Sequence, residues 1–391
     1  MSETKDYFIG LMSGTSIDAM DGCLADFSDG NCKTLATASR PFSPEEKKIL
    51  NGLCQCSNNE LEKMQLAGIM LAKIQAKVVS DLLHKSSVAA KNIIAIGSHG
   101  QTVRHCPEQG FSVQLNSPAK LAYLTGIDVI SDFRAADLCA GGEGAPLTPA
   151  FNAGFFHREQ KACLILNLGG IANLTAISEE GALLCGFDTG PADTLLDLCA
   201  RKYLGKPYDH NAQCANTGKI QQNLLNRWLS HTYFSKTPPK STGRELFNEE
   251  FLNVELLLSD EKKLSIPDLM ASLTELTVRS AFDAIKKQCQ TYPELFKSTL
   301  VLCGGGAKNP LIRKNLALRC QKIGIECVDC ASYGADPDFL EALSFAWFAY
   351  SFTHAHPLKL NTCTGAACDL IAGSFTPAIS GAFARKKRGQ F

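Results

Sequence analysis

Residues 9–21, IGLMSGTSIDAMD, decide how this chain folds. The segment begins as an apolar strand, breaks at Gly14, and then presents three hydroxyl groups and two carboxylates within nine residues. An ordinary β-turn needs only one or two Gly, Asn or Asp residues. Backbone amides exposed at a glycine turn, with hydroxyl donors beside them, form a concavity suited to phosphate. The segment alone leaves two interpretations open, a phosphate site or a polar hairpin turn that leads into a second strand at residues 22–27.

Length and composition exclude several classes of protein. A chain of 391 residues is expected to form two domains. Basic and acidic residues both number 39, so no net field favours nucleic acid or an anionic membrane. No apolar run approaches the roughly 20 residues that span a bilayer, and the N-terminal MSETKDYF lacks the apolar core of a signal peptide. We therefore expect a cytoplasmic protein without nucleic-acid or membrane partners.

The 17 cysteines do not indicate a disulfide framework or a metal centre. Their number is odd, and most stand in apolar strand or helix settings, where free cysteine behaves as a small hydrophobic residue. Cys327 and Cys330 form a lone CxxC without a second pair at zinc-ribbon spacing.

Strands and helices alternate along the chain. Apolar residues recur at helical spacing over residues 61–82, and a second helix with an apolar face is expected near residues 340–350. Short buried strands are predicted at residues 93–96 and 127–130, each ending in polar residues. This alternation indicates an α/β protein, with the glycine-rich residues 141–144 as the expected crossover between its halves.

The strand–glycine–strand pattern of residues 9–27 occurs a second time. In NLGGIANL, residues 167–174, an apolar strand breaks at Gly169 and Gly170 and leads to another strand. A third element, LVLCGGGAKNP at residues 300–310, places three glycines at a strand end ahead of a helix. Such turns let a flat ring or a phosphate approach the backbone closely. Their order indicates an internal duplication with a nucleotide site.

The order of these turns is similar to the actin-like ATPase and sugar-kinase superfamily, and longer motifs narrow the resemblance. The chain resembles the anhydro-N-acetylmuramic acid kinase family in MSGTSIDAMD (12–21), SHGQTVRH (98–105), DFRAADLCAGGEGAPLTPAF (132–151), NLGGIANL (167–174), GFDTGPADTLLD (186–197), KSTGRELFN (240–248), LTELTV (273–278), CGGGAKNP (303–310) and FLEALSFAWFA (339–349). The resemblance implies two duplicated ribonuclease-H-like domains with an ATP cleft between them. We expect these domains at residues 1–135, completed by C-terminal residues, and 136–391.

The resemblance also implies the activity. Enzymes of this family open the 1,6-anhydro ring of a cell-wall sugar with water and transfer the γ-phosphoryl group of ATP to the released 6-oxygen. The product is N-acetylmuramic acid 6-phosphate. The implied cofactor is ATP with Mg²⁺, and the implied assembly is a homodimer.

By the same resemblance, Asp188 is the catalytic base, held in a turn by Gly186, Gly190 and Pro191. An unperturbed Asp has a pKa near 4, so it is ionised at neutral pH and can accept a proton. The residues expected at ATP and its phosphates are Gly14, Thr15, Ser16, Ile17, Asp18, Ala19, Met20, Asp21, Gly169, Gly170, Gly304, Gly305, Gly306 and Asn309. Asp18 and Asp21 would also hold Mg²⁺ through water.

The residues expected at the sugar are Ser13, His99, Gln101, Arg134 and Glu341. The sugar carries a carboxylate, for which a bidentate arginine is the natural partner. Arg134 is the candidate for that role, with a surface salt bridge as its alternative. His99 is either a sugar ligand or a structural histidine. Arg244 and Glu245 either shape the cleft or contact a second subunit.

Two positions depart from the family pattern. Ala19 stands where glycine is usual, which requires ordinary backbone dihedrals there, and Ala192–Asp193 replaces a usual Gly-Asn. Asp193 adds a charge that would raise a carboxylate pKa if Asp188 were close. Two other functions stay open beside the anhydro-sugar kinase: a kinase acting on a sugar with a free anomeric hydroxyl, and a nucleotide-driven assembly protein.

Overall fold

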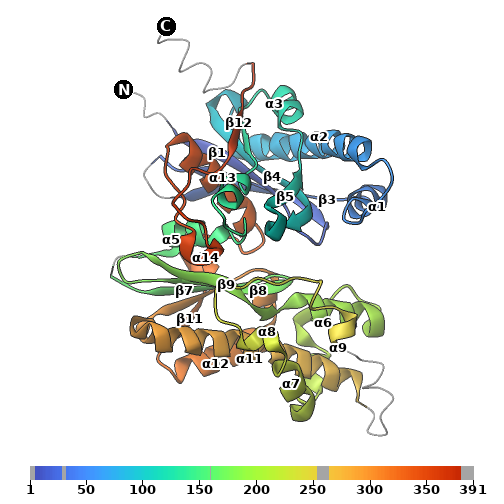
Figure 1. The fold of residues 1–391 in the computed structure, drawn as a ribbon, viewed down its shortest axis with the longest axis vertical. Helices are drawn as coiled ribbons and strands as arrows, with labels where there is room; N and C mark the ends of the chain where they lie inside the picture. Colours follow the sequence, from blue (N-terminus) through green and yellow to red (C-terminus); the bar gives the residue numbers. More distant parts are fainter. Residues whose placement is uncertain (1–4, 29–31, 159, 253–263, 380–391) are drawn as a thin grey trace. The chain divides into compact units, whose positions relative to one another are not determined.

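The computed structural model describes residues 5–28, 32–158, 160–252 and 264–379. The chain divides into two compact units, which are described separately. Unit 1 comprises residues 1–151 and 334–391, and unit 2 comprises residues 152–333. Each unit is built on one mixed β-sheet with helices packed against it (Figure 1). The predicted α/β class is confirmed.

Unit 1 contains a seven-stranded sheet in the order β12-β6-β4-β1-β2-β3, with β5 paired to β4. β2 is antiparallel to both β1 and β3, whereas β1, β4 and β6 run parallel. The strands are β1 (Tyr7–Ser13), β2 (Ala19–Asp26), β3 (Lys33–Pro41), β4 (Ile93–Cys106), β5 (Phe111–Leu115), β6 (Val129–Ser131) and β12 (Ser374–Thr376). The helices are α1 (Pro44–Gly52), α2 (Glu60–Ser86), α3 (Pro118–Thr125), α4 (Ala135–Cys139), α13 (Leu340–Thr353) and α14 (Asn361–Thr364), while α5 (Thr148–Phe156) runs across the boundary into unit 2.

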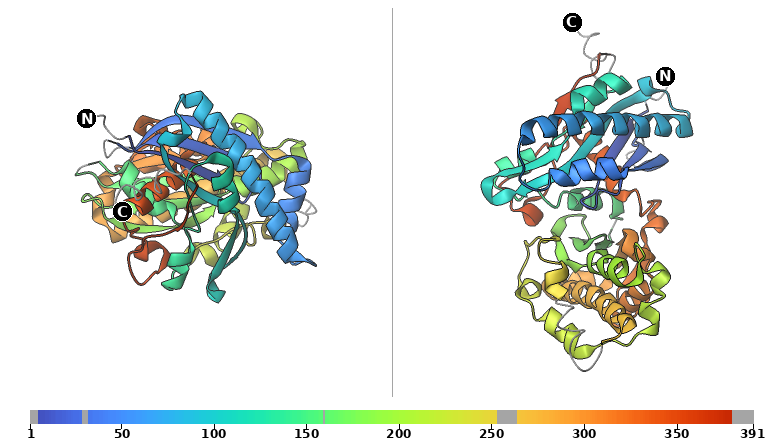
Figure 2. Two further views of the ribbon diagram at one scale, coloured as in Figure 1. Left: turned by 90° about the horizontal axis from the view of Figure 1, so that it is seen from above. Right: turned by 90° about the vertical axis from the view of Figure 1, so that its right-hand side faces the viewer.

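Glycines in the central strands of unit 1 bring α13 directly onto the sheet. Gly10 and Gly97 are paired across β1 and β4, and a Cβ on them would lie 1.8 Å from the Ala342 carbonyl oxygen and 1.9 Å from that of Phe345. On the opposite face, a Cβ on Gly22 would meet Val78 of α2. The sheet therefore lies between α2 and α13, as Figure 2 also shows.

Unit 2 contains a five-stranded sheet in the order β11-β10-β7-β8-β9. Its strands are β7 (Cys163–Leu168), β8 (Ile171–Ile177), β9 (Leu183–Pro191), β10 (Thr299–Cys303) and β11 (Glu326–Asp329). Its helices are α6 (Asp193–Cys199), α7 (Gln222–Leu229), α8 (Thr232–Ser235), α9 (Glu249–Leu252), α11 (Ile266–Thr291) and α12 (Pro310–Gln321). α11 is buried along most of its length and contributes Leu269, Leu273 and Leu276 to the core of this unit.

The two sheets share one topology, which confirms the duplication expected from the repeated glycine turns. In each, three consecutive strands form an antiparallel meander, and two further strands join in parallel beside the first. The chain order of the strands across the sheet of unit 2 is therefore 3-2-1-4-5, and unit 1 has the same order once β5, the hairpin partner of β4, and the edge strand β12 are set aside. Between the third and fourth strands lie α1 and α2 in unit 1, and α6, α7, α8, α9 and α11 in unit 2.

Several predicted elements differ in detail from the structure. The strand expected at residues 93–96 continues to Cys106, because its distal half pairs with β5. Leu61, expected on the apolar face of α2, is 78% exposed near the beginning of that helix. We expected domains at residues 1–135, completed by C-terminal residues, and 136–391; the compact units are residues 1–151 with 334–391 and residues 152–333, and α13 packs on the β1–β4 pair. Residues 141–144, the expected crossover, lie inside unit 1.

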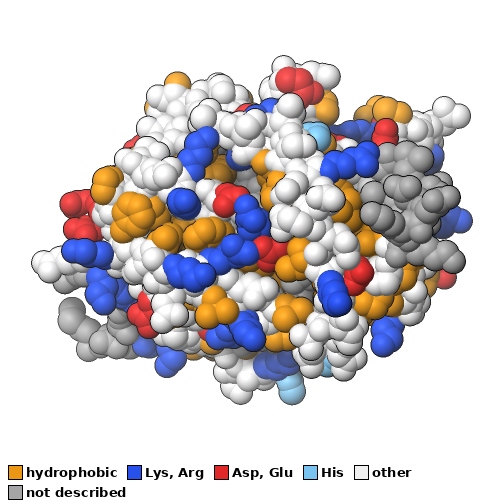
Figure 3. Space-filling model, turned by 90° about the horizontal axis from the view of Figure 1, so that it is seen from below, with side chains coloured by type: hydrophobic (Ala, Val, Ile, Leu, Met, Phe, Trp, Pro, Cys, Tyr) orange, Lys and Arg blue, Asp and Glu red, His pale blue; other side chains and the backbone are white. Residues whose placement is uncertain are grey.

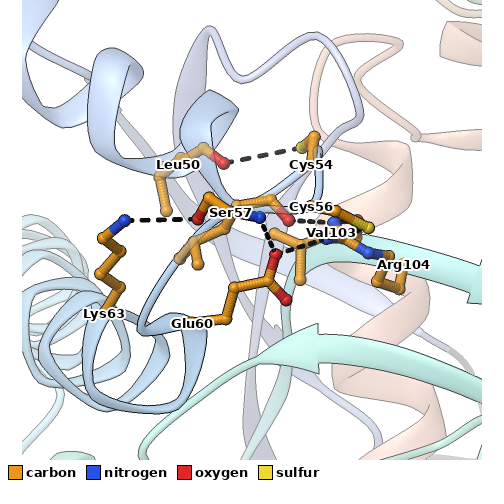
Figure 4. Close-up of polar contacts among 9 residues, drawn as sticks. Leu50, Cys54, Cys56, Ser57, Glu60, Lys63, Val103 and Arg104 are labelled. Carbon is orange, nitrogen blue, oxygen red and sulfur yellow. Dashed lines mark hydrogen bonds and ion pairs between the residues drawn. The ribbon is translucent and has the colours of Figure 1, made fainter.

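Arg104, in the extended part of β4, anchors the connection between α1 and α2 (Figure 4). Its guanidinium donates to the Leu53 carbonyl oxygen, to the Val103 carbonyl oxygen at 3.0 Å and to Glu60 Oε1 at 3.2 Å. Glu60 in turn accepts from the Ser57 backbone amide, and Lys63 donates to Ser57 Oγ at 3.3 Å. The arginine of the SHGQTVRH motif thus holds a loop in place.

The surface carries charges of both signs. On the face drawn in Figure 3, Lys and Arg side chains alternate with acidic and apolar ones, as expected for a chain with 39 basic and 39 acidic residues. None of the helices among the described residues is both long enough and apolar enough to cross a bilayer.

Candidate functional site

The first glycine turn joins β1 to β2 and is closed by a hydrogen bond from the Ile17 amide to the Gly14 carbonyl oxygen at 3.1 Å. Thr15, Ser16 and Asp18 are exposed, whereas Ile17 is buried. Ile17 adopts a φ of 55°, which is unfavourable for a β-branched residue. Such strain persists only where the surroundings impose it, and it gathers at ligand sites. The turn therefore exposes its hydroxyl groups on a backbone fixed by a buried side chain.

Gln101, in the interior of β4, connects that strand to this turn. Ser13 Oγ donates to Gln101 Oε1 at 2.5 Å, and Gln101 Nε2 donates to the Gly14 carbonyl oxygen at 3.2 Å. Both Ser13 and Gln101 are buried. Two residues that we expected at the sugar thus support the turn that we expected at the phosphates, so the structure places them together.

Asp18 and Asp21 take different partners. Asp18 Oδ1 accepts from Lys47 Nζ of α1 at 2.9 Å, whereas Asp21 Oδ1 accepts from Ser39 Oγ of β3 at 2.6 Å. Burial raises the pKa of Asp21 and the Ser39 hydrogen bond opposes that shift. In the parts of the chain that the structure describes, no group of three or more His, Cys, Asp or Glu residues gathers as a metal site.

The middle of the turn segment has a structural role. Ala19 begins β2 opposite Pro41 of β3, and Met20 is fully buried in the core of unit 1. Ala19 is not among the residues with positive φ, as its side chain requires. The left-handed conformation in this segment falls on Ile17 instead.

The buried His99 and the half-buried Arg134 form a pair in unit 1. His99 Nδ1 lies 2.9 Å from the Gly100 carbonyl oxygen, and Arg134 Nη2 lies 3.0 Å from His99 Nε2. Because the guanidinium can only donate, Nε2 is the acceptor and the proton is on Nδ1. Burial and the nearby Arg134 lower the pKa of His99 to about 3, so the imidazole is neutral.

Arg134 retains one buried donor without a partner. Its Nη1 donates to the Gly144 carbonyl oxygen at 2.7 Å, but its buried Nε finds no hydrogen-bond acceptor among the described residues. Burial lowers the pKa of Arg134 to about 10, while the charges of Glu341 and Asp137 oppose this shift. Glu341 lies in the first turn of α13 and is exposed. An unsatisfied buried donor on a cation is costly, and an anionic ligand would satisfy it.

In unit 2, the second glycine turn is bracketed by the segment that follows β9. Ala192 and Thr194 donate their amides to the Gly170 carbonyl oxygen at 3.0 and 3.1 Å, and Asp193 donates to that of Gly169 at 2.9 Å. The buried Thr194 Oγ1 has no hydrogen-bond partner within the described ranges, and it lies 2.8 Å from the position of a Cβ on Gly170. A side chain at Gly170 would therefore collide with it.

The third glycine turn packs against the second one and against Asp193. A Cβ on Gly304 would lie 2.6 Å from the Leu168 carbonyl oxygen, and one on Gly306 would lie 2.9 Å from Asp193 Oδ1. Beside this junction is a cavity of about 390 Å³. It is lined by Asp193, Leu196, Asp197, Tyr208, Asp209, His210, Asn211, Gly305, Gly306, Lys308 and Asn309.

The composition of this cavity suits a nucleotide base and sugar. Tyr208 and His210 bring two rings whose centroids are 6.1 Å apart, and Gly305 and Gly306 also line the cavity. Asn309, expected beside adenine and ribose, lines the cavity, but its Oδ1 also caps α12 by accepting from the Leu311 and Ile312 amides. Sequence analysis did not single out Tyr208, His210 or Asn211, because they lie in short turns without a recognisable motif.

Asp193, one of the lining carboxylates, stands where we expected asparagine from the family pattern. Burial, followed by the negative charge of Asp197, raises its pKa to about 7. The like charge that raises the pKa of Asp193 is that of Asp197, one helical turn further on.

Asp188 lies within β9, opposite Asn173 of β8. The expected turn is wrong, because GFDTGP extends the strand to Pro191 with an irregularity in register near Gly190. Thr242 donates its amide to Asp188 Oδ2 at 3.0 Å, Tyr233 Oη donates to the Asp188 carbonyl oxygen at 2.6 Å, and the Asp188 amide donates to the Lys240 carbonyl oxygen at 3.2 Å. The carboxylate is half-buried and fixed on a strand.

Arg244 and Glu245, whose role was left open, are both exposed. The structure thus brings the expected residues together in separate groups. Unit 1 joins Ser13, Gly14 and Gln101, and it pairs His99 with Arg134. Unit 2 joins the glycines of both its turns with Asp193 at one cavity.

Comparisons with known proteins place this geometry in a family. The model of the anhydro-N-acetylmuramic acid kinase family matches residues 6–378. The chain is 43% identical over 371 residues to an anhydro-N-acetylmuramic acid kinase of Idiomarina loihiensis, covering 94% of this chain and 98% of the relative. It is 41% identical over 376 residues to the enzyme of that name from Shewanella loihica, covering 96% and 99%.

Solved structures are more distant. An activator of 2-hydroxyisocaproyl-CoA dehydratase from Clostridium difficile with bound ADPNP aligns with a TM-score of 0.47 and 13% identity, covering 89% of this chain and 96% of that one. A ROK hexokinase from Thermus thermophilus aligns with a TM-score of 0.39 and 14% identity, covering 88% and 99%. Both scores are below 0.5, so the fold assignment rests on the strand order of the two sheets. From its sequence over nearly the whole length, the chain belongs to the anhydro-N-acetylmuramic acid kinase family.

Proposed function

We propose that this protein is an ATP-dependent anhydro-N-acetylmuramic acid kinase that acts in the recycling of cell-wall peptidoglycan. It opens the 1,6-anhydro ring of 1,6-anhydro-N-acetylmuramic acid with water and transfers the γ-phosphoryl group of ATP to the 6-oxygen. The products are N-acetylmuramic acid 6-phosphate and ADP. The family membership gives the reaction, and the residues of the chain supply the parts that it needs.

The observation that carries this proposal is the buried, unpartnered Nε of Arg134. The sugar has a lactyl carboxylate, and a carboxylate that accepts from Nε satisfies the unpartnered buried donor of a guanidinium already held by Gly144 and His99. The neutral His99 keeps the guanidinium in place without competing for the anion. In our proposal Ser13, Gln101 and Glu341 complete the sugar site.

For ATP, the proposal assigns the base and ribose to the cavity beside Gly305 and Gly306, and the phosphates to the glycine turns. Exposed hydroxyl groups at Thr15 and Ser16 and the backbone at Gly169 and Gly170 suit phosphate oxygens.

Asp18 and Asp21 offer the oxygen donors that Mg²⁺ prefers, and both already accept hydrogen bonds. Because these carboxylates already accept hydrogen bonds from Lys47 and Ser39, we propose that they bind Mg²⁺ through water rather than directly. Magnesium, when bound with ATP, neutralises charge on the phosphates.

The proposed chemistry gives Asp188 the role of general base. Its carboxylate takes a proton from the water whose oxygen bonds to the anomeric carbon, and the bond from that carbon to the 6-oxygen breaks. The 6-oxygen then bonds to the γ-phosphorus as the bond from that phosphorus to the β–γ bridging oxygen breaks. The amide of Thr242 and the strand setting of β9 fix the direction of the carboxylate.

The decisive experiment offers 1,6-anhydro-N-acetylmuramic acid and N-acetylmuramic acid separately, each with Mg²⁺ and ATP in water enriched in ¹⁸O. We expect turnover of the anhydro sugar with one heavy oxygen in the product, measured by mass spectrometry in a short reaction. Unlabelled product, or turnover of only the non-anhydro sugar, would instead identify a kinase for a free anomeric hydroxyl. ATP hydrolysis indifferent to both sugars would identify a nucleotide-driven assembly protein.

A variant tests the role of Asp188. Asp188→Asn retains an oxygen that accepts from the Thr242 amide, so the strand and loop should persist. Loss of the base should lower kcat by about 10²–10⁴-fold, with ATP affinity unchanged in calorimetry. Retained turnover would remove Asp188 from the mechanism.

We also propose that the protein is a homodimer located in the cytoplasm, where ATP is available. Sedimentation velocity and fractionation of cells expressing the chain test these two statements directly, and a monomer or a membrane-bound fraction would contradict them.

A further inference from the structure

A second cavity in unit 2 lies behind β9. It measures about 290 Å³. Its walls include Phe187 and Thr189 of β9, the residues on either side of Asp188. Alternate side chains of a strand point to opposite faces, so this cavity faces away from the Asp188 carboxylate.

Three lysines line the cavity, from three different segments: Lys236 after α8, Lys240 from the KSTGRELFN motif, and Lys287 of α11. The acidic residue of the lining, Asp283, lies 3.8 Å from Arg279 on the same helix. Across the described ranges, neither Lys236 nor Lys287 forms an ion pair. The cavity therefore holds an excess of positive charge.

Lys240 is held in place by Tyr233, and the charges of Lys287 and Asp188 both act on its ammonium group. Its ammonium group donates to the Tyr233 carbonyl oxygen at 3.2 Å and lies 4.6 Å from the centre of the Tyr233 ring. Burial and the positive charge of Lys287 lower its pKa to about 8, against the opposing carboxylate of Asp188. Like charges are brought together at a cost unless an anion accompanies them.

Part of the remaining wall is apolar, with Leu229, Phe234, Pro238 and Ala284. Hydroxyl groups of Ser235, Thr189 and Ser280 also line the cavity. A volume of about 290 Å³ is at the lower limit of ordinary ligand sites, which is too small for a whole nucleotide but sufficient for a phosphorylated sugar.

We propose that this cavity binds a small phosphate monoester, through Lys236, Lys240 and Lys287, at a site separate from the nucleotide cavity of unit 2. The phosphate accepts from the three ammonium groups, and its organic part contacts the apolar wall. The site differs in its residues from the nucleotide cavity, since the two linings share none.

The bound anion acts on Asp188 through the segment from Tyr233 to Thr242. Tyr233 and Lys240 hold the backbone of Asp188 on both sides, and Thr242 holds its carboxylate. Because Lys240 belongs to both the cavity and this clamp, an anion that fixes Lys240 also fixes the direction of the base. Occupancy therefore changes kcat rather than the KM for ATP.

The chain offers a matched pair of variants for the test. Lys286 and Lys287 are adjacent and exposed on α11, but only Lys287 lines the cavity. Glucose 6-phosphate and, separately, inorganic phosphate are titrated calorimetrically into the full chain saturated with a non-hydrolysable ATP analogue, so that the glycine turns are occupied. We expect wild type and Lys286→Gln to bind glucose 6-phosphate equally, and Lys287→Gln to bind it about tenfold more weakly.

Equal affinity in all three proteins, or no binding to any of them, would overturn the site. Binding of inorganic phosphate with the same affinity as the ester would show that the apolar wall contributes nothing, and would overturn the ester assignment.

Turnover gives a second readout. We expect glucose 6-phosphate to change the kcat of wild type and Lys286→Gln but not that of Lys287→Gln. An equal change in all three would place the effect at another site. This arm rests on the proposed kinase activity, whereas the calorimetric arm does not, so the two proposals can fail separately.

Discussion

Replacing Asp193 by asparagine should stabilise unit 2 at high pH and leave it unchanged at low pH. The pKa of Asp193 is raised from 3.8 to about 7, by burial first and by Asp197 second. The folded state therefore holds a proton that the unfolded chain has already released between about pH 4 and pH 7. Over this interval the stability of the wild type falls as the pH rises, and the full cost is present above pH 7.

The shift sets the size of the effect. At 1.36 kcal/mol per pKa unit the cost has an upper bound of about 4 kcal/mol, and since Asp193 retains contact with solvent we expect about 1–2 kcal/mol. Asparagine has the shape of the protonated acid and carries no charge, so Asp193→Asn removes this cost. For a unit of this size, that corresponds to a rise in Tm of about 3–6 °C at pH 8, about a third of that at pH 5, and almost none below pH 4.

Thermal unfolding of wild type and variant by calorimetry at pH 5, 6, 7 and 8 measures this difference. Asp283→Asn, at an exposed carboxylate of α11, is the control and should show no such pH dependence. The same substitution should lower the KM for ATP several-fold at pH 8, because Asp193 lies beside Gly305 and Gly306. A difference in Tm that is constant with pH, or a wild type more stable than the variant at pH 8, would refute the reasoning.

Three further predictions concern packing, substrate binding and thiols. Gly97→Ala should destabilise unit 1 by at least about 3 kcal/mol, since its Cβ would lie 1.9 Å from the Phe345 carbonyl oxygen. Gly52→Ala is the control and should not destabilise the unit, because no atom lies within 4 Å of its Cβ position. Urea unfolding measures the free energy of unfolding of both variants. Arg134→Gln should raise the KM for the anhydro sugar at least about tenfold and leave that for ATP unchanged, and equal effects on both would contradict a sugar role. In the native protein an aromatic disulfide reagent should react rapidly with only the exposed thiols, which are Cys54, Cys56, Cys139 and Cys368. Rapid modification of the buried Cys163 or Cys199 would disprove their packing role.

The sequence was sufficient for the features that depend on neighbours along the chain. The first glycine turn, its repetition at Gly169 and Gly170, and the strand before Gly304 all have the predicted form. A turn needs particular residues at particular spacings, and a strand or helix needs a hydrophobic period. These elements can therefore be predicted from residues that are close together in the sequence. The motifs, several of them long, also identified the family.

Asp188 shows where local reasoning failed. Gly186, Gly190 and Pro191 suggested a turn, but pairing with β8 extends them into a strand. The end of β4 shows the same effect, because β5 pairs with residues beyond the strand expected at residues 93–96. Pairing with a distant strand supplies hydrogen bonds that outweigh the preference of a short segment, and no local pattern reports it.

Only the tertiary structure decided which polar groups are satisfied. Nothing in the sequence around Arg134 indicates that His99 and Gly144 take two of its edges and leave Nε alone. Likewise, the excess charge behind β9 arises because Lys240 and Lys287, far apart in sequence, line one cavity. The sequence by itself determined the turns, the duplication and the family, since these follow from local spacing and composition. The structure decided burial, hydrogen bonding and charge balance, because these depend on groups that only folding brings within a few ångströms of one another.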